Sequence, residues 1–202
     1  MNIKNQISCS CGQCGLELND TSPKYSLMCA CEDCRQALSW AEKNGGKKPK
    51  NILYSVYLRS DISNYFGLEN MVVTHLRDDA SSTRVYCKKC YSCIAIDHVN
   101  YHNNVFMIQP DHSKQNFNVD IPPKAFINLQ DHPEDFIELD SKSIPVFHSR
   151  KYPQERERFL SIEPIEEFLS PPKTKAKGIT LRDLISKIGS IKVLHLTKGE
   201  IL

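Results

Sequence analysis

The chain has 202 residues, enough for one domain with a sizeable core or for one domain with an appendage. Its net charge of +2 does not mark the whole chain as a binder of nucleic acid or of a membrane surface, and no run of 18 apolar residues predicts a membrane span. The first residues lack the apolar core of a signal peptide. We therefore expect an intracellular, cytoplasmic protein whose thiols stay reduced.

The first half of the chain predicts strands arranged around one helix. We expect one strand over residues 7–18, carrying Cys9 and Cys11 on one face, and another over Tyr25–Cys31. A helix is expected from Glu32 to about Lys43, ended by the Asn44-Gly45-Gly46 turn. Further strands are predicted over Ile52–Leu58, Met71–Leu76, Thr83–Tyr86, Ile94–Val99 and Val105–Ile108.

The second half predicts fewer elements. Residues 125–129 and 136–139 have the composition of edge strands or extended arms, and residues 170–178 form a Pro- and Lys-rich linker. An amphipathic helix is expected near the C-terminus, capped by Thr180 and followed by a possible strand in residues 191–196; its apolar positions are Leu181, Leu184, Ile185 and Ile188.

Short strands with frequent turn signals predict a mainly β domain of antiparallel sheets, with a short α-helical C-terminal extension. The composition becomes strongly charged after about Ser149. We therefore place one domain in residues 5–150 and a charged linker with the C-terminal extension in residues 151–202.

All nine cysteines lie between residues 9 and 93, and seven of them form closely spaced sets. Cys87 and Cys90 have the spacing of a chelating turn, and Cys9 and Cys11 that of a clip on a strand. Four thiolates from these two segments predict a closed tetrahedral zinc site that stabilises the fold.

The third set is Cys29, Cys31 and Cys34, in which a turn through Glu32-Asp33 is expected to bring the last cysteine back toward the first two. Three ligands leave a fourth position for water or a thiol, as in a catalytic zinc site. Alternatively, another side chain fills that position and the site is inert. The candidate fourth ligands are Cys14, Cys93, His75, His98 and His102.

Cys14 and Cys93 each extend a pair to a second C-x-x-C spacing. Either is a possible alternative ligand, but small buried residues are the interpretation that we favour, since free cysteine is among the most buried residue types. The basic tracts in residues 45–50 and 171–177 are not interleaved with aromatic residues, so we expect solvated loops and no nucleic-acid partner.

The order of these motifs resembles the glutathione-dependent formaldehyde-activating enzyme family, which also includes centromere protein V. The matching segments are C-S-C-G from Cys9, C-A-C-E-D-C-R from Cys29 and Y-C-K-K-C from Tyr86, with a later match over Pro122–Phe147. The resemblance covers roughly residues 5–150. It implies a β-tent fold with a structural zinc on Cys9, Cys11, Cys87 and Cys90, and a catalytic-type zinc on Cys29, Cys31 and Cys34.

The resemblance also implies a reaction in which a carbon–sulfur bond forms or breaks, with formaldehyde and glutathione as the named reactants. Our first hypothesis is therefore a zinc-dependent carbon–sulfur lyase-like enzyme acting on a thiol adduct such as S-hydroxymethylglutathione. Arg35, beside the catalytic-type site, either pairs with a substrate carboxylate or bonds nearby backbone carbonyls. The alternative hypothesis is a non-enzymatic zinc-binding interaction module whose C-terminal helix recruits a protein partner.

Overall fold

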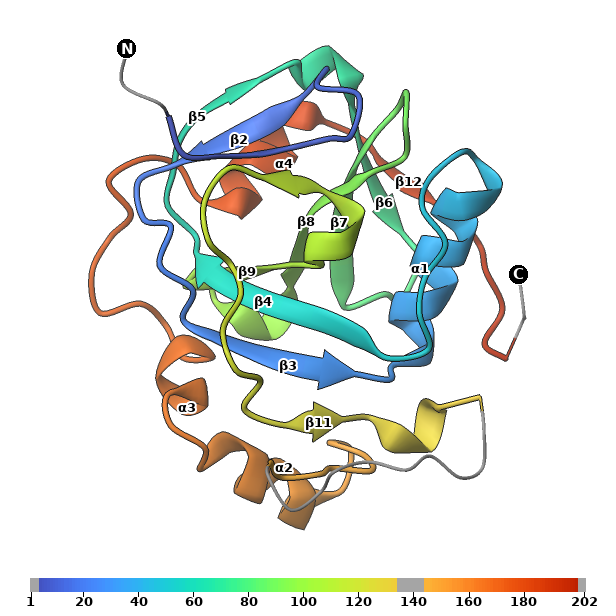
Figure 1. Cartoon of the computed structure of the whole chain (residues 1–202), viewed down its shortest axis with the longest axis vertical. Coiled ribbons are helices and arrows are strands. Elements are labelled where there is room, and N and C mark those ends of the chain that lie inside the picture. The colour runs from blue at the N-terminus through green and yellow to red at the C-terminus, as the bar shows by residue number, and fades with distance from the viewer. Residues whose placement is uncertain (1–3, 134–143, 200–202) are drawn as a thin grey trace.

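The computed structural model describes residues 4–133 and 144–199. Within these ranges the chain is mostly β, as predicted, with two sheets and short helices (Figure 1). The strands are β1 (Gln6–Ser8), β2 (Gly15–Leu18), β3 (Tyr25–Cys29), β4 (Leu53–Arg59), β5 (Ile62–Phe66), β6 (Met71–His75), β7 (Ser82–Cys87), β8 (Cys93–His98), β9 (Val105–Ile108), β10 (Lys114–Gln115), β11 (Phe126–Ile127) and β12 (Ile191–Val193). The α-helices are α1 (Glu32–Lys43), α2 (Pro153–Leu160), α3 (Ile165–Phe168) and α4 (Leu181–Ile188), and the 3-10 turns include η3 (Pro110–His112) and η4 (Leu129–Asp131).

The smaller sheet has the strand order β10-β1-β2-β5, and the larger has the order β11-β3-β4-β9-β8-β7-β6-β12. Pairing is antiparallel except at the two edges of the larger sheet, where β11 pairs with β3 and β12 pairs with β6 in parallel. The sheets are therefore mainly antiparallel, as predicted, and the parallel pairing is confined to these edges. Both edge strands come from distant parts of the chain, so no hairpin turn fixes their direction.

Side chains of the larger sheet alternate between two hydrophobic clusters, because successive residues of a strand point to opposite faces. On β4, Val56 and Leu58 face the smaller sheet and α4, while Tyr57 faces the helical side. The helical side is covered by α1, α2 and α3, which contribute Leu38, Phe159 and Ile165. The molecule therefore has three layers, with the larger sheet in the middle.

Most predicted strands of the larger sheet are confirmed to within one residue at each end, and the helix over Glu32–Lys43 is confirmed with the same bounds. The prediction of one strand over residues 7–18 was wrong. The chain forms β1 and β2 there, joined by a tight loop in which the amide of Cys9 donates to the carbonyl of Cys14 (3.0 Å) and Gly12 has a φ of +73°. Strand β5 was not predicted, because exposed Ser63 and Asn64 interrupt its apolar pattern.

The C-terminal helix is also confirmed, with a capping box between Thr180 and Asp183 at its start. Its apolar residues Leu181, Leu184 and Ile185 are buried in the cluster between the sheets. The predicted strands at 125–129 and 191–196 are present in part as β11 and β12. The segment 136–139 lies outside the described residues. The helices of residues 4–133 and 144–199 have at most 12 residues, too few to span a bilayer.

Candidate metal centres

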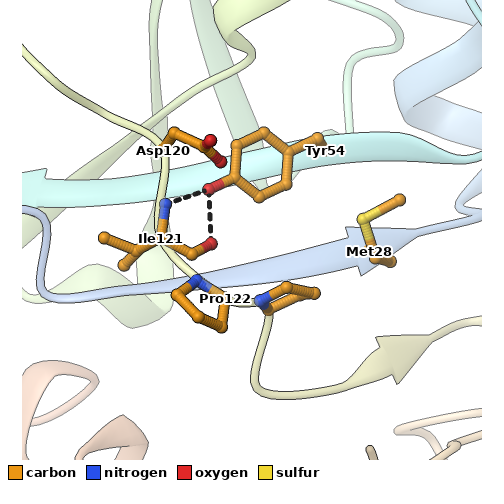
Figure 2. A pocket seen from close by; sticks show the side chains of 6 residues that line it. Met28, Tyr54, Asp120, Ile121 and Pro122 are labelled. Atoms are coloured by element: carbon orange, nitrogen blue, oxygen red, sulfur yellow. Dashed lines mark hydrogen bonds between the residues drawn. The ribbon is translucent and has the colours of Figure 1, made fainter. Parts of the chain in front are cut away.

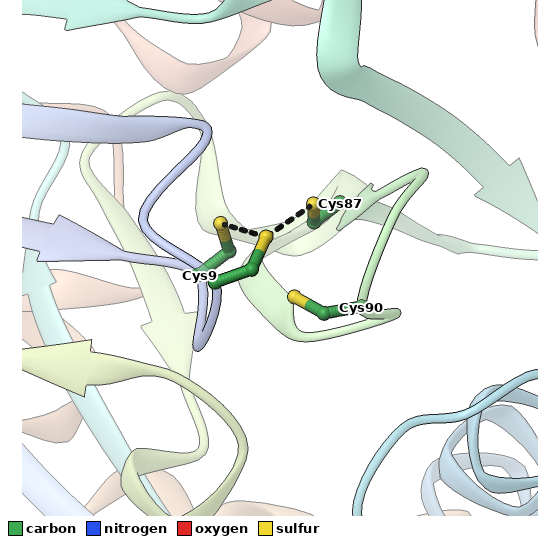
Figure 3. Close-up of side chains that lie close together, drawn as sticks. Cys9, Cys87 and Cys90 are labelled. Carbon is green, nitrogen blue, oxygen red and sulfur yellow. Dashed lines mark hydrogen bonds between the residues drawn. The ribbon is translucent and has the colours of Figure 1, made fainter.

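The first candidate centre joins two hairpins that are about 80 residues apart in the sequence (Figure 3). The Sγ atoms of Cys9, Cys11, Cys87 and Cys90 all lie within 4.8 Å of one another. Tetrahedral zinc with Zn–S bonds of about 2.3 Å places its sulfur ligands about 3.8 Å apart. The Cys9–Cys11 and Cys11–Cys87 Sγ distances are 3.4 and 3.7 Å, so this donor set fits a zinc ion.

The loops that carry these thiols are themselves held together. The amide of Ser10 donates to the hydroxyl of Ser92 (2.9 Å), and the Ser92 hydroxyl donates to that of Ser10 (2.9 Å). The turn between β7 and β8 also contributes an amide donor, since Lys89 N–H donates to the Cys87 sulfur (3.4 Å). Amide donors to sulfur favour the thiolate form, which is the form that binds metal. The site therefore ties the smaller sheet to the larger one.

The second candidate centre is the cysteine triple, Cys29, Cys31 and Cys34, whose Sγ atoms also lie within 4.8 Å of one another. Its local structure differs from the expectation, because β3 ends at Cys29 and Glu32-Asp33 is the first turn of α1. Cys31 is the N-cap of α1, and Cys34 lies three residues into the helix. The helix dipole at this end favours negative charge, and therefore thiolates.

Hydrogen bonding among the thiols and burial raise the pKa values of Cys29 and Cys34 to about 12. Three thiols at this separation repel one another when ionised, so a bound cation is what stabilises the trianion. The donor set and the burial of Cys29 and Cys34 thus fit a metal ion of the zinc type. Cys31 is the most exposed of the three cysteines.

No further His, Cys, Asp or Glu of residues 4–133 and 144–199 joins the triple within 4.8 Å. Of the proposed fourth ligands, Cys14 and Cys93 are buried in the hydrophobic clusters, as expected for small core residues. His75 bonds Thr83 (2.8 Å), and the His98 ring accepts from the amide of Asn100 (3.0 Å). His102 is exposed.

Arg35 lies on α1 directly after the triple, and its guanidinium donates to the backbone carbonyls of Ala30 and Asp131. This is the carbonyl-binding role considered for it, and the pairing with a substrate carboxylate stays a prediction. The Asp131 carboxylate also accepts from the amide of Glu32 (3.4 Å), so η4 is held against the start of α1.

Sequence reasoning missed three residues around the triple. The side-chain amide of Asn128 donates to Cys29 Sγ (3.6 Å), and Arg150 Nε lies 3.5 Å from Asn128 Oδ1. Arg84 on β7 is 2% exposed and contacts the carbonyl of Asp33 (3.4 Å). Strand alternation places the side chains of Arg84 and Cys87 on opposite faces of the strand. No sequence pattern links residues 128 and 150 to the cysteines.

A surface pocket of about 430 Å³ lies beside β3 and β4, with Met28, Tyr54 and Ile121 in its lining (Figure 2). The Tyr54 hydroxyl accepts from the Ile121 amide (3.0 Å) and donates to the Ile121 carbonyl (2.7 Å). No cysteine of either centre lines the pocket. Its chemistry is therefore separate from that of the thiols.

Searches with this chain found no matching protein-family model and no matching curated protein.

Proposed function

We propose that the protein is a zinc-dependent carbon–sulfur lyase-like enzyme with a β-tent fold, and that it acts on an adduct of a small thiol such as S-hydroxymethylglutathione. The observation that carries this proposal is the cysteine triple, which gathers three thiols with no fourth His, Cys, Asp or Glu side chain beside them among residues 4–133 and 144–199. A three-ligand zinc site with an open position is typical of catalytic centres, whereas four ligands are typical of structural ones.

Two zinc ions would be held, a structural one by Cys9, Cys11, Cys87 and Cys90 and a catalytic-type one by Cys29, Cys31 and Cys34. When bound at the triple, zinc supplies a Lewis acid that stabilises a thiolate at neutral pH. The remaining contributions come from the chain. The N-terminus of α1 favours negative charge at the triple, and the Arg35 contacts hold η4 beside it.

The reaction needs no oxidant or reductant. In the cleavage direction the carbon–sulfur bond of the hydroxymethyl thioether breaks and its electron pair goes to sulfur, which leaves as a thiolate. The electrons of the O–H bond form the carbonyl of formaldehyde, and the hydroxyl proton is released to water. In the reverse direction the thiolate attacks the aldehyde carbon and the alkoxide oxygen takes a proton. Groups that stabilise the thiolate favour cleavage.

The test combines metal content with turnover, comparing the wild type with Cys31→Ser. The wild type should bind two zinc ions per chain, one of them exchanging readily when a small thiol is added, and should form the adduct from formaldehyde and glutathione faster than buffer does. Cys31→Ser should lose the exchangeable zinc and the activity while keeping its fold by circular dichroism. Two tightly held ions with no thiol effect and no turnover would contradict the proposal and favour the non-enzymatic zinc-binding module.

A further inference from the structure

Two arginines approach the cysteine triple from different elements. Arg84 projects from β7 to the helical side of the larger sheet, where it is almost fully buried (2% exposed). Its guanidinium lies 3.4 Å from the carbonyl of Asp33, in the turn of α1 that leads to Cys34. Burial acts to lower the pKa of Arg84, but the Cys34 thiol, followed by Tyr86, Cys93 and Cys31, raises it above its ordinary value.

Arg150 approaches the triple from the segment that precedes α2. Its Nε is 3.5 Å from the Asn128 side-chain oxygen, and the amide of the same asparagine donates to Cys29 Sγ (3.6 Å). The guanidinium also lies over the Phe159 ring, 5.2 Å from its centroid, which fixes its position. Its pKa, which burial acts to lower, is raised by nearby Tyr57, Cys29, Tyr101 and Cys31.

Within residues 4–133 and 144–199, neither arginine forms an ion pair with a carboxylate. Burying a guanidinium without an anionic partner is costly, since arginine does not deprotonate in proteins. Arg84 faces Cys34 and Cys31 of the triple as well as Tyr86 and Cys93. Arg150 faces Tyr57 and Tyr101 as well as Cys29 and Cys31 of the triple. The positive charges of Arg84 and Arg150 are therefore placed to balance negative charge on sulfur.

We propose that Arg84 and Arg150 make the cysteine triple selective for a monoanionic ligand, and that this ligand is the thiolate of a small thiol. The inference rests on the proposed function in one respect, that the triple holds a zinc ion. Three thiolates around one divalent cation carry a net charge of −1, and two guanidiniums change the local balance to +1. One bound monoanion makes the cluster neutral, whereas a neutral ligand leaves a buried positive charge.

Arg84 and Arg150 are then positioning and specificity residues, which act on the ligand through the electrostatic potential at the triple. Removing one of them should weaken the binding of an anion without weakening that of a neutral ligand. At the separations and effective dielectric of partly buried sites, one unit charge is worth at least about tenfold in affinity. A thiol that binds as its thiolate must also lose its proton, so its binding should shift to higher pH when a positive charge is removed.

The test uses the full chain with cobalt(II) in place of zinc, because cobalt gives an absorption spectrum that responds to the ligand at the open position. The probes are 2-mercaptoethanol, acetate and imidazole, titrated at several pH values. 2-Mercaptoethanol represents a ligand that binds as a thiolate, acetate represents a carboxylate anion, and imidazole represents a neutral ligand. The four-cysteine site is closed and contributes a constant background, so the difference spectrum reports on the triple.

The informative variants are Arg150→Gln and Arg84→Gln, with Arg150→Lys and Arg84→Lys as charge-conserving partners. Exposed Arg156→Gln is the matched control, since it makes the same change in net charge at a position outside the lining of the triple.

We expect the Gln variants of Arg84 and Arg150 each to lower the ratio of thiol to imidazole affinity by about tenfold or more and to move thiol binding to higher pH. The Lys variants and Arg156→Gln should stay within about threefold of the wild type. Arg150 is the less buried residue of the two, so its variant serves even if Arg84→Gln fails to fold.

The outcomes separate this inference from the proposed function. If the Gln variants leave the ratio unchanged, or imidazole and thiol respond alike, charge selection is wrong even when the lyase reaction is present. If acetate binds as tightly as the thiol and obeys the same charge dependence, the thiolate assignment is overturned. Thiolate binding with the predicted dependence but without turnover would support the inference and contradict the lyase activity.

Discussion

Arg84 and Cys87 are three residues apart on β7, yet they belong to different centres on opposite faces of the larger sheet. Cys87 lies in the cluster between the two sheets and joins the four-cysteine site. Arg84 contacts the first turn of α1 on the other face. One strand therefore helps to build both centres, and substitutions at these two positions should have separable effects.

Cys87→Ser should remove one zinc ion and strongly destabilise the protein. The side chain is fully buried and shares its centre with thiols from a distant hairpin. Metal-linked folding free energy of structural zinc sites is on the order of 10 kcal/mol, comparable to the whole stability of a typical domain. Metal analysis and thermal unfolding measure the two effects.

Cys93→Ala is the control for that variant, since Cys93 is also buried but lies outside both centres. It should keep two zinc ions per chain and lose only about 1 kcal/mol. A loss of metal from Cys93→Ala equal to that from Cys87→Ser would show that the thiols are assigned to the wrong centre.

Asn128 should contribute to the metal affinity of the triple through its bond to Cys29 Sγ. It has a φ of +59°, a left-handed conformation that asparagine and glycine tolerate. Asn128→Gly removes the bond with little backbone strain, and we expect roughly 10- to 100-fold weaker metal binding at the triple. Competition with a chromophoric chelator measures this change.

Asn128→Ala should show the same loss of affinity together with about 1–2 kcal/mol of lost stability, because alanine is strained in the left-handed region. If both variants bind metal as tightly as the wild type, the amide does not support the cysteine.

Leu184→Ala tests whether α4 is an integral part of the core. Leu184 is fully buried in the cluster between the sheets, and removing its side chain leaves a cavity. We expect a loss of about 2–5 kcal/mol in urea unfolding. Exposed Lys187 on the same helix gives the matched control, and Lys187→Ala should change stability by less than about 0.5 kcal/mol. Equal effects of the two substitutions would contradict this packing.

His112 should make the protein sensitive to mild acid. Burial, with smaller effects of Lys47 and Lys50, lowers its pKa to about 4 from the ordinary value of 6.5, although Asp111 acts in the opposite direction. The unfolded chain therefore takes up a proton more readily than the folded one as the pH falls below 6.5. The stabilisation is complete above that pH and is lost progressively down to about pH 4.

Between pH 7.5 and pH 5 the expected loss from this one residue is about 2 kcal/mol. Urea unfolding of the wild type and of His112→Leu at both pH values isolates this contribution, because metal loss in acid affects both proteins alike. An NMR titration in which the His112 ring protonates near pH 6.5 would rule the mechanism out.

The sequence by itself determined the local features. The spacing of seven cysteines defined two pairs and one triple, and the structure gathers the triple and brings the two predicted pairs together. Apolar alternation located most strands of the larger sheet, and the Thr180 cap with its apolar spacing located α4. These predictions succeed because chelate spacing, strand alternation and capping depend on residues close together in the chain.

Only the tertiary structure decided what surrounds the thiols. The two centres lie on opposite faces of one sheet, and the triple is flanked by Arg84 from β7 and by Asn128 and Arg150 from the segments after β11. The parallel pairing of β11 and β12 is likewise set by the return path of distant segments. Such contacts join residues separated by dozens of positions, where no local periodicity records which side chains meet, so the charge around the triple emerges only when the chain is folded.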